Sequence, residues 1–242
     1  MTIGSMQRFW DARAKENALF YVDTRLAYGS PDIERFWSNG EADLDHLLGD
    51  LEVKLVSSDV VLDIGCGVGR LTRALCARVA EVLAIDVSEQ MLERARALNP
   101  QLSNAQWLHG DGVSLAPVQD NSVTACFSHV VFQHIPDPGI TLGYVREMGR
   151  VLRAGGWAGF QVSNDPAIHR PRGRPARERL RAITGRAPRG QQDERWRGSH
   201  VDLDALARTA VESGLRIERV VNPGTQYCLV LARRNEPSEA VF

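Results

Sequence analysis

Three glycines occur within five positions of one short stretch of the chain, the segment VLDIGCGVGR at residues 61–70. The residues before them are apolar except for Asp63, as in a buried strand, and those after Arg70 have the pattern of a helix. A strand that turns sharply into a helix leaves free N–H groups at the helix start, and glycines let a ligand approach that backbone closely. The stretch therefore predicts a strand–loop–helix unit that either binds a nucleotide-like ligand or is only a tight turn.

Short apolar segments alternate with helix-like segments between residues 59 and 163, which is typical of repeated strand–helix–strand units with a parallel sheet. Ser88 and Asp202 are predicted N-caps of helices, and Pro223-Gly224 is a turn that makes the last two strands antiparallel. We therefore expect an α/β fold with a mixed sheet. Strands are predicted at 59–65, 81–87, 105–111, 122–130, 156–163, 216–222 and 225–233, and helices at 71–79, 89–98, 140–152 and 201–215.

Two segments stand outside this alternation, and they divide the 242 residues into a main domain with attachments. Residues 1–45 are helix-like and aromatic, and are predicted to form a helical lid. Residues 46–234 form the main domain, within which 164–199 is an insertion or mobile loop that holds ten arginines against four acidic residues. Residues 235–242 are predicted to be a frayed tail.

Acidic residues follow the glycine loop at intervals that suit a nucleoside. Asp86 ends the second predicted strand, 21 residues after Gly65, where a carboxylate can accept hydrogen bonds from both ribose hydroxyls. Asp111 ends the third strand, where its carboxylate can receive an adenine amino group beside the N–H of Gly112. Asp63 lies just before the loop, where a buried carboxylate would order the loop and balance a cationic ligand.

The spacing of the glycines argues against a dinucleotide. A dinucleotide loop has the pattern G-x-G-x-x-G, whereas here the third glycine, Gly69, comes one residue early. Asp63 would also repel a pyrophosphate, and it favours a ligand that carries an amino group or a sulfonium.

Five segments in order, VLDIGCGVGR, AIDVS, HGDG, FSHVVFQHIPDP and RVLRAGGWAGFQV, resemble the class I S-adenosylmethionine-dependent methyltransferases of the seven-stranded, small-molecule type. The likeness covers residues 55–163 through motifs and 200–233 through topology. It implies a Rossmann-like seven-stranded sheet of order 3-2-1-4-5-7-6, with the last strand antiparallel and helices on both faces. A binding crevice is then expected at the carboxyl ends of strands one and four.

The resemblance also implies S-adenosyl-L-methionine as cofactor. In that family the glycine loop holds the methionine portion, the acid after strand two binds the ribose, and the Asp after strand three binds adenine. The cofactor-binding residues carried over to this chain are Asp63, Gly65, Gly67, Gly69, Asp86, Asp111, Gly112 and Ser128.

Methyl transfer from a sulfonium is an in-line displacement, so positioning of the acceptor can supply most of the catalysis. A hydroxyl or phenol acceptor also needs a base, and the segment SHVVFQHIPDP after strand four offers His134 as a candidate general base. The alternative for His134 is a structural role in the wall of the donor pocket, and His129 is expected to be structural. Phe132 and Gln133 are expected to line the pocket.

The lid contains aromatic and basic side chains that can stack on a flat ring and pair with a carboxylate. The alternative is that the aromatic residues pack the lid onto the sheet. The arginine excess of residues 164–199 is consistent with an anionic acceptor or with a solvated loop. The expected acceptor-binding residues of the lid are Trp10, Arg13, Tyr21, Arg25 and Tyr28.

Several classes of function are disfavoured. The net charge of −1 gives no overall attraction to nucleic acid or to an anionic membrane, and no apolar run reaches the roughly 20 residues that span a bilayer. The four cysteines form no CxxC pair, so we expect no metal site and a cytoplasmic setting. Residues 128–131 lack the Asn/Asp-Pro-Pro-aromatic turn of enzymes that methylate amino groups of DNA bases or glutamine. Nothing in the sequence indicates an oligomeric state.

The sequence thus predicts a methyltransferase that moves a methyl group from S-adenosylmethionine to oxygen, or to nitrogen, of a small aromatic or lipophilic metabolite. Two alternatives stay open. One is an NAD(P)-dependent oxidoreductase, and the other is a non-catalytic module that binds S-adenosylmethionine.

Overall fold

A seven-stranded sheet forms the centre of the molecule, as a computed structural model that describes residues 3–170 and 187–236 shows. The strand order is β3-β2-β1-β4-β5-β7-β6, as predicted. β7 pairs antiparallel with β5 and β6, and every other neighbouring pair is parallel. The strands are β1 (Val60–Ile64), β2 (Glu81–Asp86), β3 (Ala105–His109), β4 (Val123–Ser128), β5 (Leu152–Val162), β6 (Leu215–Val221) and β7 (Cys228–Arg234).

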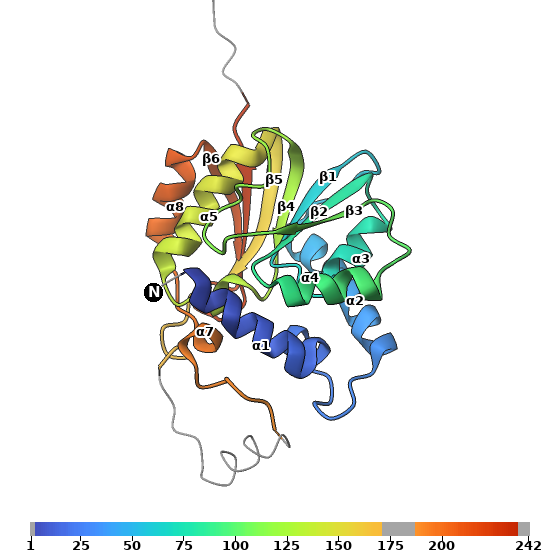
Figure 1. The fold of residues 1–242 in the computed structure, drawn as a ribbon. Helices are drawn as coiled ribbons and strands as arrows, with labels where there is room; N and C mark the ends of the chain where they lie inside the picture. The colour runs from blue at the N-terminus through green and yellow to red at the C-terminus, as the bar shows by residue number, and fades with distance from the viewer. Residues whose placement is uncertain (1–2, 171–186, 237–242) are drawn as a thin grey trace, which may run out of the picture.

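Helices cover both faces of this sheet (Figure 1). On one face α2 (Ile33–Leu51) and α3 (Arg70–Cys76) bury leucines against β1, β4 and β7, and α4 (Glu89–Leu98) packs beside them on β2 and β3. On the other face α5 (Pro138–Val151) and α8 (Leu203–Glu212) pack side by side over a larger apolar cluster. Two layers of apolar side chains therefore hold the strands, and the ends of the strands stay available for a site.

The local signals read from the sequence are confirmed at most element ends. Ser88 caps α4 by accepting a hydrogen bond from the Met91 N–H, and Asp202 caps α8 through the Ala205 N–H. β5 begins four residues earlier than predicted, because Leu152 already pairs with Val123 before the ladder shifts register. The predicted helix over 140–152 accordingly ends at Val151.

Helix α1 (Ile3–Val22) lies across the end of the sheet, below the strands in Figure 1. Asn17 has non-helical backbone angles and divides α1 into two helical parts. Asp11 fixes α1 to the start of α4, where its carboxylate accepts hydrogen bonds from Ser88 Oγ (2.7 Å) and the Gln90 N–H (3.3 Å). The predicted lid boundary at residue 45 lies within α2, which packs on the sheet face, so α1 is the helix that lies over the strand ends.

Part of the arginine-rich segment packs on α1. Residues 171–186, where most of the predicted arginine excess falls, lie outside the described residues, as do 237–242 of the predicted tail. The Arg189 N–H donates to Glu16 Oε1 (3.0 Å), and Arg195 donates to the backbone carbonyl of Ser5 (3.0 Å). The short helix α7 (Glu194–Arg197) contacts the 3-10 turn η1 (Phe132–His134) after β4. These contacts bring both attachments to the same end of the sheet.

Among the described residues, none of the helices is both long enough and apolar enough to cross a bilayer.

The contact between α5 and α8 gives a direct test of this packing. A Cβ on Gly149 would lie 2.4 Å from the Ser213 carbonyl oxygen, whereas one on Gly143 of the same helix would meet nothing closer than 3.7 Å. We expect Gly149→Ala to lower the free energy of unfolding by roughly 1–3 kcal/mol through overpacking, and Gly143→Ala to raise it by up to about 1 kcal/mol through helix propensity. Urea denaturation of the two variants checks this, and equal effects would contradict the packing.

Candidate functional site

The glycine loop turns back on itself between β1 and α3. Gly65, Gly67 and Gly69 all have positive φ angles, of 75°, 56° and 89°. A Cβ on Gly65 would lie 2.5 Å from the Val131 side chain, and one on Gly67 would lie 2.8 Å from Val22 of α1. The backbone conformation and the close approach of the Val131 and Val22 side chains therefore both require glycine at positions 65 and 67.

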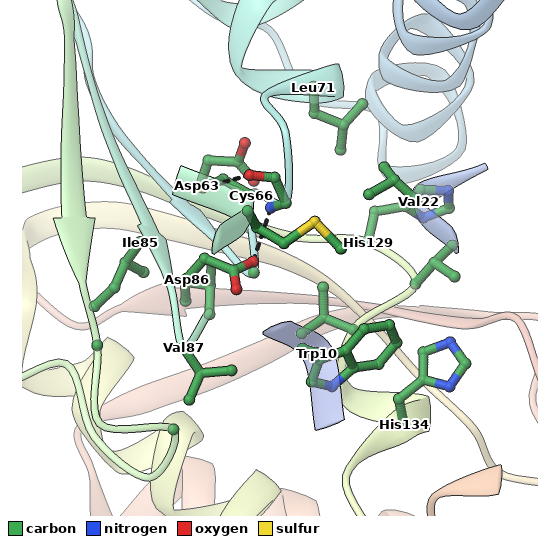
Figure 2. A pocket seen from close by; sticks show the side chains of 18 of the residues that line it. Trp10, Val22, Asp63, Cys66, Leu71, Ile85, Asp86, Val87, His129 and His134 are labelled. Carbon is green, nitrogen blue, oxygen red and sulfur yellow. Dashed lines mark hydrogen bonds between the residues drawn. The ribbon is translucent and has the colours of Figure 1, made fainter. Parts of the chain in front are cut away.

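Asp86 at the end of β2 holds this loop in place. Its carboxylate accepts hydrogen bonds from the Gly67 N–H and the Ser88 N–H, each at 2.8 Å. Burial raises the pKa of Asp86. The carboxylate lines the cavity beside the loop (Figure 2), and each of its oxygens has a further lone pair for a ligand hydroxyl.

Asp63 of β1 lines the same cavity. It is 2% exposed and accepts a hydrogen bond from Thr72 Oγ1 at 2.6 Å. Burial raises the pKa of Asp63 to about 6, although Thr72 and the nearby Arg70 act in the opposite direction. The site can therefore place a negative charge at the end of the glycine loop near neutral pH.

The cavity includes five of the eight residues predicted to bind the cofactor, namely Asp63, Gly65, Gly67, Asp86 and Gly112. The other three lie outside its lining. Gly69 packs against Trp107 and Asn99, and Ser128 is buried and donates to the Ile64 carbonyl (3.1 Å). The ligand contacts predicted for them stay predictions.

Asp111 is the third residue outside the lining. Its exposed carboxylate accepts hydrogen bonds from the N–H groups of Val113 (2.9 Å) and Ser114 (2.7 Å) and from Ser114 Oγ (2.7 Å). In the structure Asp111 shapes its own turn, and Gly110 and Gly112 on either side form the wall.

Only two of the five lid residues predicted to bind an acceptor, Trp10 and Tyr21, line the cavity. Arg13 lies between the rings of Phe9 and Tyr21 and pairs with Glu16 (3.0 Å). Tyr28 also donates to Glu16, through its hydroxyl (2.8 Å). The Tyr21 hydroxyl donates to the same carboxylate (2.7 Å), so three of the predicted residues meet around Glu16, and only Tyr21 among these three also lines the cavity.

Arg25 lies outside the lining as well. It forms two hydrogen bonds to Asp43 (2.9 and 2.8 Å) and two to Asp23 (2.7 and 2.8 Å). Its guanidinium is therefore already paired with two carboxylates, which does not support the prediction that it binds an anionic acceptor.

His134 belongs to a chain of buried amides. Gln161 Nε2 donates to Gln133 Oε1 (2.7 Å), so the Gln133 amide group faces His134 Nε2 (3.2 Å). His134 Nδ1 in turn donates to the Trp196 carbonyl of α7. Burial lowers the pKa of His134 to about 4, although the bond to Trp196 acts the other way. Because both ring nitrogens have protein partners, His134 has no free lone pair to accept a proton. The structure therefore favours the structural role of His134 over the predicted general-base role.

Phe132 and Gln133 were both predicted to line the pocket, but they lie outside its lining and pack against other buried residues. Phe132 is buried against Phe160 and Tyr144, and Gln133 is occupied with His134 and Gln161.

Several cavity residues were not predicted from the sequence. Cys66 lines the cavity from the loop, Arg70 from the start of α3, and Tyr144 from α5. His129, which was expected to be structural, lies on the lid side of the cavity in Figure 2. Arg70 and His129 lie within the motif segments VLDIGCGVGR and FSHVVFQHIPDP, which was a usable signal, whereas only the packing of α5 brings Tyr144 to the cavity.

The carboxylate of Asp63 provides a test of this local burial. Its folded pKa is raised from 3.8 to about 6, so the folded state binds its proton more tightly than the unfolded state. Stability from this group is then present below about pH 3.8 and is lost as the pH rises through about 6. We expect Asp63→Asn to be less destabilising at pH 7 than at pH 4, by up to about 3 kcal/mol. Urea denaturation of both proteins at the two pH values checks this, and a pH-independent difference would contradict it.

Comparison with known proteins agrees with this geometry. Residues 62–160 match the family described as Methyltransferase domain. The demethylmenaquinone methyltransferase of Staphylococcus haemolyticus is 35% identical over 126 residues, which cover 51% of this chain and 50% of that protein. The biotin biosynthesis bifunctional protein of Cellvibrio japonicus is 40% identical over 101 residues, which cover 40% of this chain and 18% of that protein. The chain thus spans half or less of the length of these two relatives.

A solved structure extends the likeness in fold to almost the whole chain. Phosphoethanolamine N-methyltransferase 1 of Haemonchus contortus, solved in complex with phosphoethanolamine and S-adenosylhomocysteine, has a TM-score of 0.68 at 16% identity. The likeness covers 98% of this chain and 50% of that one.

Proposed function

Because this chain belongs to the class I S-adenosylmethionine-dependent methyltransferases, we propose that it transfers a methyl group from S-adenosylmethionine to a small, largely apolar acceptor. The observation that carries the proposal is the cavity between the glycine loop and α1, where Asp63 and Asp86 face the apolar and imidazole side chains of the opposite wall (Figure 2). This arrangement offers one polar wall for a donor and one apolar wall for an acceptor.

The residues present fit this donor. The backbone of Gly65 and Gly67 lines the cavity, and neither position has room for a Cβ. Asp86 offers carboxylate oxygens where ribose hydroxyls are expected, and Asp63 supplies negative charge near the loop. S-adenosylmethionine would supply an activated methyl group, so the chain's own contribution is to bind the donor, exclude water and orient the acceptor.

The acceptor is proposed to be small and lipophilic, with oxygen or nitrogen as its nucleophile. Its expected wall is apolar and consists of Met6, Trp10, Val22, Val131 and Ile135. The name of the demethylmenaquinone methyltransferase relative supports an acceptor of this kind. Since Arg13 and Arg25 are held by carboxylates of the protein, an anionic acceptor has less support.

Donor binding gives the first test. We expect S-adenosylhomocysteine to bind in a calorimetric titration, and NADH and NADPH not to bind. Asp86→Ala removes the carboxylate proposed to hold the ribose, and is expected to weaken binding by about 2 kcal/mol, or about 30-fold in Kd. Asp120→Ala removes the same charge from an exposed site and serves as the control. Tight binding of a nicotinamide nucleotide, or unchanged affinity of Asp86→Ala, would contradict the donor assignment.

A labelled donor then tests the acceptor. We expect transfer of the labelled methyl group to lipophilic phenols or quinols, with amines second, and weaker transfer to carboxylic acids. The measurement is label recovered in the extracted product. A protein that binds the donor and transfers to no compound of these classes would instead be a non-catalytic module.

A further inference from the structure

Tyr144 is the residue that α5 contributes to the cavity, and none of the five motif segments contains it. Its helix packs on the turn that follows β3. Glu147, which lies one turn further along α5, accepts a hydrogen bond from the Leu115 N–H (2.9 Å). A Cβ on Gly143 would lie 3.7 Å from the Val113 carbonyl oxygen. The packing of α5 therefore brings Tyr144 to the part of the cavity wall beside this turn.

The ring and the hydroxyl group of Tyr144 lie in different surroundings. The ring belongs to the apolar cluster under α5 and α8 and packs against Phe132, with the two ring centroids 5.4 Å apart. The hydroxyl makes no hydrogen bond to any residue that the structure describes, yet it is not enclosed as the unpartnered Thr141 Oγ1 of the same helix is. Since Tyr144 is only 8% exposed and lines the cavity, its accessible hydroxyl is open to a ligand there.

The charges near this hydroxyl place it at the end of the cavity where the adenosine part of the donor is proposed to bind. Burial raises the pKa of Tyr144, and three nearby carboxylates raise it further, those of Asp111, Asp86 and Glu147. Asp86 is the residue proposed to hold the ribose, and Asp111 adjoins Gly112 of the cavity wall. The phenol therefore stays protonated near neutral pH and can donate a hydrogen bond to a base attached to that ribose.

Asp111, to which the family resemblance assigns the base, is occupied elsewhere. Its carboxylate is exposed, lies outside the cavity lining, and accepts hydrogen bonds from Val113 and Ser114. No described residue holds the Tyr144 hydroxyl in this way. A buried phenol usually has a hydrogen-bond partner, so a ligand that supplies one is favoured at Tyr144 rather than at Asp111.

We propose that the Tyr144 hydroxyl recognises the adenine base of the donor by donating a hydrogen bond to one of its ring nitrogens, in place of the contact that the resemblance gives to Asp111. This inference rests on the proposed function. A base without an acceptor at that position leaves the buried hydroxyl unpaired, and therefore binds more weakly. Tyr144 is thus a specificity-determining residue of the donor site.

The decisive experiment measures the Kd of S-adenosylhomocysteine by calorimetry for the wild type and for Tyr144→Phe, which removes only the hydroxyl oxygen. We expect the Kd to rise about 3- to 10-fold, the effect of one lost hydrogen bond between neutral groups. Tyr227→Phe removes the same atom from an exposed side chain, and this matched control is expected to bind as the wild type does. Unchanged affinity of Tyr144→Phe would overturn the proposal.

Three analogues test whether the loss comes from a direct contact. In 1-deaza-, 3-deaza- and 7-deaza-S-adenosylhomocysteine, a C–H group replaces one ring nitrogen of the adenine. We expect one of the three to bind the wild type more weakly than S-adenosylhomocysteine does, and to bind Tyr144→Phe about as well as it binds the wild type, because the bond is already absent. A Tyr144→Phe variant that loses affinity equally for S-adenosylhomocysteine and for all three analogues would contradict the contact.

Asp111→Asn separates the proposal from its nearest rival. Asparagine keeps a carbonyl oxygen for the N–H groups of Val113 and Ser114, so the turn is preserved while the negative charge is removed. We expect this variant to lose less affinity for S-adenosylhomocysteine than Tyr144→Phe does. A loss confined to Asp111→Asn would assign the base to Asp111 and overturn the proposal.

The same titrations distinguish this inference from the proposed function. If the wild type binds no S-adenosylhomocysteine, the proposed function itself fails. If the wild type binds it and Tyr144→Phe binds it equally well, only the present inference fails.

Urea denaturation without ligand gives a readout that is independent of binding. Because the hydroxyl has no partner among the described residues, we expect Tyr144→Phe to unfold at the same urea concentration as the wild type or at a slightly higher one. A variant that does not fold, or that unfolds at a clearly lower urea concentration, would mean that the hydroxyl already has a partner within the protein. That result would overturn the proposal.

Discussion

The hydrogen bond between the Gly67 N–H and the Asp86 carboxylate joins the ends of the neighbouring strands β1 and β2 at the point where the site forms. Asp86 ends β2, Gly67 follows β1, and the same carboxylate accepts the Ser88 N–H at the start of α4. One side chain therefore sets the path of the glycine loop and the start of the next helix. The burial that raises the pKa of Asp86 is the cost of placing a carboxylate where a ligand can also reach it.

The position of α1 depends on the glycine loop, because Val22 of α1 packs directly on the backbone of Gly67. Val22 of α1 lies where a side chain on Gly67 would be, so α1 and the loop fit only when residue 67 has no Cβ. Two carboxylates of α1 hold the helix in place. Asp11 accepts a hydrogen bond from Ser88 at the start of α4. Glu16 accepts hydrogen bonds from Tyr21 and Tyr28 and pairs with Arg13 and Arg189. The arginine and tyrosine side chains that look suited to bind a ligand thus hold the lid to the segment that precedes α8.

The two histidines of the cavity have different hydrogen-bond surroundings. His134 is enclosed by an amide chain that runs through Gln133 and Gln161, and its hydrogen bonds are complete within the protein. His129 lines the cavity, its Nε2 lies 4.0 Å from Asp43 Oδ2, and its buried Nδ1 has no hydrogen-bond partner among the residues that the structure describes. Val130 between them has a positive φ of 59°, an unusual conformation for a β-branched residue, and its N–H donates to Gln161 Oε1. That strained turn separates the surroundings of the two imidazoles.

The sequence by itself determined the elements and the polar wall of the site, because these depend on local patterns. Alternating apolar segments gave the strands and helices, and the motif order implied the sheet order that the structure has. Asp63, Gly65, Gly67 and Asp86 could be placed because each lies at a strand end or in the turn that follows it. Only the tertiary structure decided which lid and strand-four residues face the cavity. Arg25, for example, is held by Asp43, which is 18 residues away in the chain, and His134 by Trp196, which is 62 residues away. Such long-range partners decide whether a polar atom remains free for a ligand, and no local pattern in the sequence specifies them.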